Sequence, residues 1–151
     1  MKFDLRSLNR FLLLKIPIAR LAGIRVVRLD DKACELTLRH RWLNQNPFGS
    51  VYFGVLVMGG ELATGIPLFK AVNDSGRKIS MLVKSHRSEF LKKATGRIRF
   101  VFDDMEDLNW NLQTALQSGE KHAFELHSRA LDEQGETVAT FSYLWSVKCY
   151  C

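Results

Sequence analysis

Residues 51–72 read VYFGVLVMGGELATGIPLFKAV, and this stretch decides the fold. Its residues are apolar almost all round, which is typical of a helix buried on every side rather than of a helix with one polar face. The turn-forming residues Asn73, Asp74, Ser75 and Gly76 end it. We therefore expect a central helix over residues 51–72, surrounded by the rest of the chain.

The segments on either side of this helix predict mainly strands. Before it, apolar residues at helical spacing predict a helix over residues 5–16 that stops at Pro17, because the residue before a proline disfavours the α conformation. Two alternating segments, 24–29 and 34–39, then predict a hairpin. After the central helix, alternation predicts strands at 79–83, 97–102, 124–127 and 137–147, with a helix at 104–118 between the second and the third.

This order of elements predicts an α+β fold in which a curved antiparallel sheet wraps around the central helix. The 151 residues suffice for one domain over residues 1–151, in which residues 1–20 form an N-terminal helix and its lead-in. Hydrophobic residues make up 46% and charged residues 25%, which is average for a soluble protein and excludes a disordered or collagen-like chain.

The net charge and the cysteines indicate the class of partner and the cellular compartment, but they do not decide the function. The net charge of +6 favours an anionic partner. Three cysteines give no disulfide framework, and the apolar run at residues 11–14 is too short for a signal peptide, so we expect a cytoplasmic protein. The uncharged stretch at residues 42–60 contains too many polar residues for a membrane span, and the four histidines form no metal-ligand cluster.

The segment NPFGSVYFG at residues 46–54, followed by Glu61, resembles the hotdog-fold thioesterase superfamily. The resemblance is to the phenylacetyl-CoA-type thioesterases and to a neighbouring group of uncharacterised hotdog domains. Phe90 and Leu91 before a basic pair, and GETVA at residues 135–139, extend it over residues 23–148. It implies the hotdog fold, an acyl-CoA or acyl-carrier thioester as substrate and a homodimer, with a tetramer as the alternative. It implies no cofactor beyond the CoA moiety of the substrate.

Glu61 is the first candidate catalytic residue. A carboxylate in so apolar a run needs a reason other than packing. The resemblance implies that Glu61 matches the acid of the family, which acts as a general base on water or as a nucleophile. It also implies that the helix start of one protomer faces the acid of the other. The structural alternative is a buried ion pair of Glu61 with Lys84 or Arg87.

The start of the central helix is the second candidate feature. Its unpaired N–H groups and its partial positive charge suit a developing oxyanion. We expect the amides of Tyr52, Phe53 and Gly54 to be the donors, with Gly54 letting the ligand approach; the alternative is that Gly54 only permits close packing. The resemblance implies that Asn46 orients the water or the thioester, and an Asx turn before the helix is the alternative.

The remaining expected substrate-binding residues are Gly49, Ser50, Lys84, Lys92, Lys93 and Arg97. The resemblance implies that Lys92, Lys93 and Arg97 lie near the phosphates of CoA, to which lysine and arginine bind well, and a solubilising surface is the alternative. Lys84 is expected either to pair with Glu61 or to be solvated.

Three functions remain open from the sequence. A thioester hydrolase accounts for the acid in the apolar helix. Many phenylacetyl-CoA-type members carry His-Gly-Gly where this chain has Tyr52, Phe53 and Gly54, so a non-catalytic acyl-thioester binder is the alternative. A nucleic-acid-binding module ranks third and is not expected, because the net charge is its only support.

Overall fold

The computed structural model describes residues 3–150. In chain order its elements are α1 (Leu5–Lys15), α2 (Pro17–Leu21), β1 (Arg25–Leu29), β2 (Cys34–Arg39), the short 3-10 helix η1 (Trp42–Asn44), α3 (Phe53–Asp74), β3 (Lys78–Phe90), β4 (Arg97–Phe102), α4 (Met105–Ser118), β5 (His122–Leu131) and β6 (Thr137–Tyr150). Except for the short helices α2 and η1, this is the predicted order. The helix predicted at 104–118 is also confirmed as α4: Asp104 caps its start, and Gly119, in the left-handed conformation, follows its last residue.

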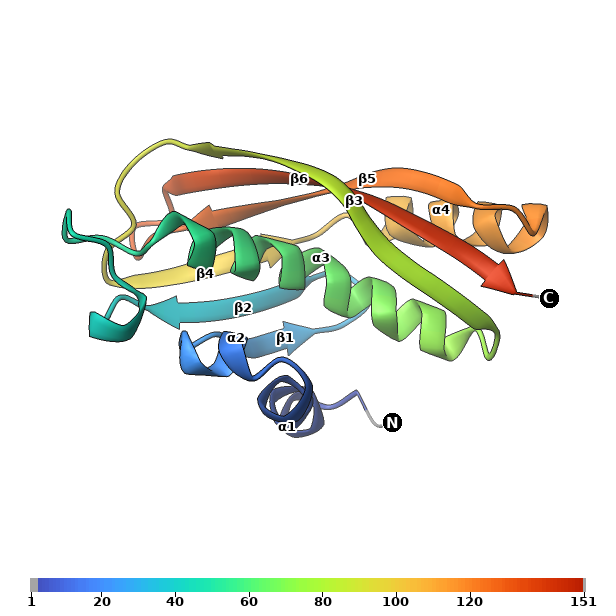
Figure 1. The fold of residues 1–151 in the computed structure, drawn as a ribbon, viewed down its shortest axis with the longest axis horizontal. Helices are drawn as coiled ribbons and strands as arrows, with labels where there is room; N and C mark the ends of the chain where they lie inside the picture. The colour runs from blue at the N-terminus through green and yellow to red at the C-terminus, as the bar shows by residue number, and fades with distance from the viewer. Residues whose placement is uncertain (1–2, 151) are drawn as a thin grey trace.

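The six strands form one antiparallel sheet in the order β1-β2-β4-β5-β6-β3. Figure 1 shows the long helix α3 crossing one face of this sheet, with α1 and α2 beside β1, and with α4 close to β5 and β6. The predicted α+β fold, a curved sheet around a central helix, is confirmed. The two edge strands are β1 and β3.

Three side chains of the sheet hold α3 in place by hydrogen bonds. Tyr143 Oη donates to the carbonyl of Val57 at 2.6 Å, and Ser128 Oγ donates to the carbonyl of Gly60 at 2.8 Å. One turn further, Trp145 Nε1 donates to the hydroxyl of Thr64 at 3.0 Å. Because buried polar atoms need partners, these bonds satisfy the sheet's tyrosine, serine and tryptophan and fix the rotation of the helix.

Two glycines allow α3 to approach the sheet this closely. A Cβ atom on Gly59 would lie 2.3 Å from the ring of Phe100, and a Cβ on Gly60 would lie 2.5 Å from the ring of Phe141. Both distances are far below van der Waals contact. The two glycines therefore make room for aromatic rings of the core.

The structure differs from the sequence expectation at several elements. The sequence predicts the central helix over residues 51–72, but α3 spans Phe53–Asp74, because Val51 forms a bridge with Gln45 and because Asn73 and Asp74 still belong to the helix, which ends at its C-cap Ser75. The strand predicted at 124–127 is the middle of β5, which is longer because it pairs with β6 along its length.

Two further elements differ at the sides of the core. The helix predicted over residues 5–16 does stop before Pro17, but a second short helix, α2, begins at that proline, which occupies its first turn. The strand predicted at 79–83 is the first part of β3, which continues to Phe90 because it pairs with β6 along its length. Residues 84–89 are polar on both faces, so their sequence does not show the alternation that identified the other strands.

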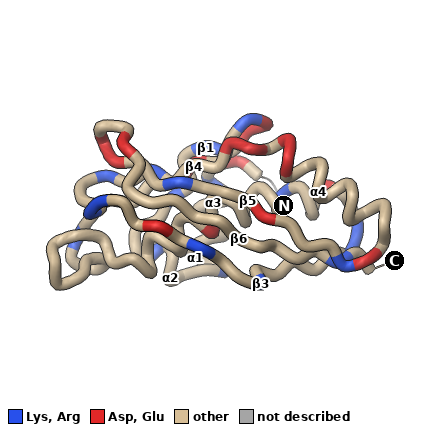
Figure 2. Tube along the Cα trace, turned by 90° about the horizontal axis from the view of Figure 1, so that it is seen from above, with Lys and Arg blue, Asp and Glu red and all other residues tan. Residues whose placement is uncertain are grey.

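Helix α3 is long and apolar enough to span a bilayer by length and composition, but 67% of its apolar window is buried inside the protein. We therefore describe it as the core helix. Figure 2 shows the charged residues spread over turns, helices and strands, whereas β6 carries a single one, Lys148.

Candidate active site

Glu61 lies in the third turn of α3 and forms part of the wall of a cavity of about 160 Å³. The other wall residues are apolar and come from α1, the α1–α2 junction, α3, β3 and β6: Leu8, Phe11, Ile16, Leu62, Gly65, Ile66, Phe69, Met81 and Trp145. One carboxyl group therefore faces a space that is otherwise built from hydrocarbon and aromatic surface.

The carboxyl group of Glu61 has no hydrogen-bond or ion-pair partner among the described residues 3–150. Burial disfavours the charged form and raises the pKa of Glu61 from its ordinary 4.5 to about 7. A carboxyl group with such a pKa exchanges its proton readily near neutral pH. It is therefore suited to accept a proton from water and to return it.

Gly65, one turn after Glu61, keeps the space beside the carboxyl group open. A Cβ atom at this position would lie 3.1 Å from Glu61 Oε1 and 3.1 Å from the ring of Trp145. Any side chain here would press on both groups. Gly65 thus preserves the cavity on the side of the acid.

The structural alternative for Glu61, an ion pair with Lys84 or Arg87, does not form within the chain. Arg87 pairs instead with Glu89 at 3.1 Å on the exposed part of β3. Lys84 is exposed on the same strand and forms no ion pair in the part of the chain that is described. Burial of Glu61 is consequently not offset by a cation of its own chain.

The start of α3 leaves two amides free, not three. Tyr52 is the N-cap residue, and its N–H donates to the carbonyl of Asn44 at 2.8 Å, so the expected donor role of the Tyr52 amide is wrong for this conformation. Within residues 3–150, the amides of Phe53 and Gly54 have no acceptor. Val55 begins the bonds of the helix by donating to Tyr52 at 3.0 Å. Phe53 and Gly54 are therefore the candidate oxyanion donors.

Asn46 uses its side chain to build the loop before α3. Its Oδ1 accepts the N–H groups of Phe48 at 2.9 Å and Ser50 at 3.3 Å, and its Nδ2 donates to Ser50 Oγ at 2.9 Å. Gly49 lies between them with φ of +78°, a conformation that favours glycine. This is the Asx-turn alternative, so Asn46, Gly49 and Ser50 shape the helix start by fixing the loop.

A second cavity, of about 510 Å³, opens at the start of α3. Its walls come from the loop before α3, the first turn of that helix and the segment after β3, and include Asn46, Ser50, Tyr52, Phe53, Phe90, Lys92 and Lys93. Phe53 packs edge-on against Phe90, with ring centroids 5.9 Å apart. Three of the expected substrate-binding residues, Ser50, Lys92 and Lys93, are thus part of the wall of this cavity.

The expected phosphate-binding residues are divided by the structure. Lys93 is part of the wall of the second cavity, and its Nζ donates to the carbonyl of Phe48 at 3.2 Å. Lys92 Nζ is held between Asp132 at 2.6 Å and Glu136 at 2.7 Å, so its charge is already neutralised. Arg97 borders a different cavity, on the outer face of the sheet.

Sequence reasoning missed the contribution of α1 to the cavity beside Glu61. Phe11 stacks on Phe69 with ring centroids 5.4 Å apart, and Leu8 and Ile16 complete that side. No local signal in the sequence tells where an amphipathic helix docks. The apolar residues of α1 identified a buried face but not the element that it covers.

Comparisons with known proteins agree with this fold. A family model described as a domain of unknown function, DUF4442, matches residues 5–147. A solved structure from Pseudomonas aeruginosa, described as a protein of unknown function and probable thioesterase, is 27% identical, with a TM-score of 0.83 and 99% coverage of both chains. A thioesterase from Haemophilus influenzae is 14% identical, with a TM-score of 0.68 and coverage of 99% of this chain and 93% of its own.

A search of curated proteins finds no significant match. The solved structures confirm the expected hotdog fold.

Proposed function

The chain belongs to the DUF4442 family of domains of unknown function, and from this premise we propose that it is a thioester hydrolase with Glu61 as its catalytic acid-base group. The proposed substrates are acyl-CoA or acyl-carrier thioesters. Support at the level of the fold comes from the probable thioesterase of Pseudomonas aeruginosa, which resembles this chain over nearly its full length.

One observation carries the proposal: an unpartnered carboxyl group on the wall of an apolar cavity. Leaving such a group without a partner destabilises the folded chain once the group ionises. A purely structural role would favour an apolar side chain at this position. Catalysis requires the carboxyl group, because hydrolysis of a thioester needs a group that removes a proton from water.

We infer the following steps. The Glu61 carboxylate accepts a proton from a water molecule while the water oxygen bonds to the thioester carbonyl carbon. The resulting tetrahedral oxyanion expels the thiolate as the carbon–sulfur bond breaks, and the proton held by Glu61 goes to the leaving sulfur. The products are a carboxylic acid and a free thiol. Direct attack by Glu61 on the carbonyl carbon is the alternative first step, with water then hydrolysing the anhydride.

The oxyanion donors are proposed to come from a second copy of the chain. Gly54 and Glu61 lie seven residues apart on one helix, roughly 10 Å along its axis, so one carbonyl cannot reach both groups. β3 is an edge strand of 13 residues with an unpaired outer side, and Leu82 on it is 63% exposed. Pairing of two β3 edges would cover this strand, and we propose that it places the Phe53 and Gly54 amides of one protomer opposite Glu61 of the other.

The size of the cavity beside Glu61 suggests which acyl group it accepts. Its volume is about 160 Å³, and an apolar protein cavity of about 150 Å³ accommodates benzene. We propose that it takes the acyl chain, so that short acyl groups and small aromatic acyl groups of about six carbons fit without rearrangement.

The test is thiol release from butyryl-, hexanoyl-, phenylacetyl- and palmitoyl-CoA by the wild-type chain and by Glu61→Gln. The variant keeps the shape of the side chain but cannot accept a proton, and we expect kcat to fall by at least about 10²-fold. Glu125→Gln, which removes an exposed carboxyl group on β5, is the matched control and should retain full activity. Equal activity of Glu61→Gln and the wild type would overturn the assignment.

A non-catalytic acyl-thioester binder is the second candidate function. It is favoured by the helix start, where the Tyr52 ring lies over Gly54 and packs against Phe53 with ring centroids 5.0 Å apart. Saturable binding of acyl-CoA without thiol release from any of the four thioesters would establish this reading and exclude the hydrolase.

A further inference from the structure

Five arginine side chains surround one cavity of about 350 Å³ on the outer face of the sheet. Arg20 belongs to α2, and Arg25 and Arg97 are the first residues of β1 and β4. Arg39 is the last residue of β2, and Arg41 follows two residues later. We call this set the arginine cluster. Strand register explains part of it, because Arg39 lies directly opposite Arg97. The cavity shares no wall residue with the one beside Glu61.

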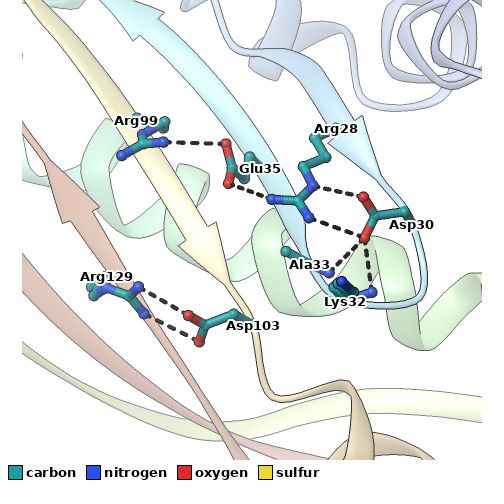
Figure 3. A network of polar contacts seen from close by, with 8 residues as sticks. All are labelled: Arg28, Asp30, Lys32, Ala33, Glu35, Arg99, Asp103 and Arg129. Carbon is teal, nitrogen blue, oxygen red and sulfur yellow. Dashed lines mark hydrogen bonds and ion pairs between the residues drawn. The ribbon is translucent and has the colours of Figure 1, made fainter.

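No member of the arginine cluster forms an ion pair with a carboxylate of residues 3–150. Figure 3 shows the contrast further along the same face, where Arg28 and Arg99 share Glu35, and Arg129 pairs with Asp103 at 3.0 Å. The outer face of the sheet therefore has one half in which the guanidinium groups are paired with acids and another in which they are not. Glu133 lies beside the unpaired half, and its carboxylate accepts a hydrogen bond from the backbone N–H of Arg97 at 2.9 Å rather than from the guanidinium group of that residue.

Two guanidinium groups of the cluster are held in place without being neutralised. Arg20 Nη1 donates to the carbonyl of Ile24 at 3.2 Å, and Arg41 Nη2 donates to that of Leu21 at 2.6 Å. Arg20 Nε is buried and has no acceptor in the described part of the chain. Burial lowers the pKa of Arg20, and repulsion by the positive charges of Arg25 and Arg41 lowers it further. An anion would relieve this repulsion.

We propose that the arginine cluster binds a compact phosphate-bearing anion, of which pyrophosphate is the minimal example. Arginine presents paired N–H donors that fit phosphate oxygens, and two guanidinium groups held in place beside three others favour a ligand with more than one phosphate. The site is concave, with a volume in the lower range of small-molecule pockets, which favours a compact ligand over an extended membrane surface. This inference goes beyond thioester hydrolysis and does not depend on Glu61.

The first experiment is a calorimetric titration of the wild-type chain with pyrophosphate in 50 mM NaCl. We expect saturable binding, which Arg39→Gln/Arg97→Gln weakens at least tenfold. The matched control, Arg99→Gln/Arg129→Gln, removes the same number of charges from the acid-paired half and should leave Kd within about twofold. Thermal unfolding without ligand checks that both double variants fold, and Arg25→Gln provides a single substitution with less structural risk.

Further arms identify the source of the phosphates. ADP and free CoA are compared with pyrophosphate, and tighter cluster-dependent binding of one of them identifies the natural carrier. Lack of saturable pyrophosphate binding, or equal loss in both double variants, would overturn the proposal. Cluster-dependent binding to phosphatidylglycerol vesicles with no binding of pyrophosphate would also overturn it, in favour of a membrane surface.

Discussion

At the residue scale, Glu61 is the feature that packing does not explain. Its neighbours on α3 are apolar, its carboxyl group has no partner within residues 3–150, and Gly65 leaves space beside it. Loop residues such as Asn46 behave in the opposite way, because their polar atoms are used up in local hydrogen bonds. The contrast separates a residue that is free to act on a ligand from residues that position the backbone.

The raised pKa of Glu61 predicts how stability depends on pH. The folded chain keeps the proton up to about pH 7, whereas the unfolded chain loses it near 4.5. The folded state therefore binds more protons between these values, and the free energy of unfolding falls as pH rises through this window, by on the order of 3 kcal/mol. Urea unfolding at pH 5 and pH 8 measures this change, and the free energy of unfolding of Glu61→Gln should not show the decrease seen in the wild type. If variant and wild type differ in free energy of unfolding by the same amount at both pH values, the prediction is wrong.

The same ionisation predicts the pH dependence of the proposed hydrolysis. The base must be unprotonated to accept a proton from water, so kcat/KM should rise with pH and reach half its plateau near pH 7. Initial rates of thiol release between pH 5.5 and 9 measure this. A profile that is flat below pH 7 would mean that Glu61 is not the ionising group.

At the scale of elements, α1 and α3 together enclose the cavity beside the acid. α1 supplies Leu8 and Phe11, and α3 supplies Phe69, on which Phe11 stacks. The sheet fixes α3 from the other side, through Tyr143, Ser128 and Trp145. In the proposed hydrolase, the position of α1 therefore determines how long an acyl chain the cavity accepts.

Phe11→Ala is expected to shift the acyl preference toward longer chains, because it removes a ring from the wall of the cavity. The measurement is kcat/KM for thiol release from butyryl- to decanoyl-CoA. Leu13→Ala on the same helix, where the side chain is 55% exposed, is the control and should leave the profile unchanged. An unaltered profile in Phe11→Ala would place the acyl chain elsewhere.

Gly59→Ala tests the close approach of α3 to the sheet. The new Cβ would lie 2.3 Å from the Phe100 ring, which is fully buried, so we expect a loss of about 1–3 kcal/mol in the free energy of unfolding. The double variant Gly59→Ala/Phe100→Leu should show a smaller cost than the sum of its single substitutions, because the contact partner is smaller. Simple additivity in urea unfolding would argue against this contact.

At the scale of the whole molecule, the proposed site is complete only when two copies pair. Each chain carries one acid and one helix start, and these lie too far apart on α3 to act on the same carbonyl. The exposed edge of β3 is the surface through which we propose that the copies associate. The arginine cluster lies on the outer face of the sheet, separate from the Glu61 cavity.

Complementation tests the shared site. Phe53→Pro removes one candidate donor amide at the first helical position, where proline is well tolerated, and Tyr52 before it already has an extended backbone. Glu61→Gln and Phe53→Pro homodimers should both be impaired. Heterodimers made by co-expression should recover activity, because one of their two sites then has both groups intact.

If the mixed dimers are no more active than either parent, the acid and the donors belong to the same chain.

Leu82→Glu on the β3 edge should give monomers in light scattering, and the monomers should be less active than the wild-type dimer. Val27→Glu on the opposite edge strand, β1, is the matched control and should leave the dimer intact.

The sequence by itself determined the α+β class, the order of the main elements and the choice of Glu61. These follow from local properties: alternation marks half-buried strands, and an acid within an apolar helix stands out from its neighbours. The full length of β3 and the start of α2 did not follow, because the polar second half of β3 is a strand only through its pairing with β6.

Only the tertiary structure decided which groups remain free to act. Tyr52, Asn46 and Lys92 could contact a substrate by residue type, yet each is already bonded within the chain. The backbone amide of Tyr52 donates to Asn44, and the side-chain amide of Asn46 donates to Ser50. The ammonium group of Lys92 pairs with Asp132. Likewise, the enclosure of Glu61 by α1 and the gathering of the five arginines join segments that are distant in sequence. The physical reason is the same in each case: bond formation and burial depend on neighbours in space, which the spacing of residues along the chain does not specify.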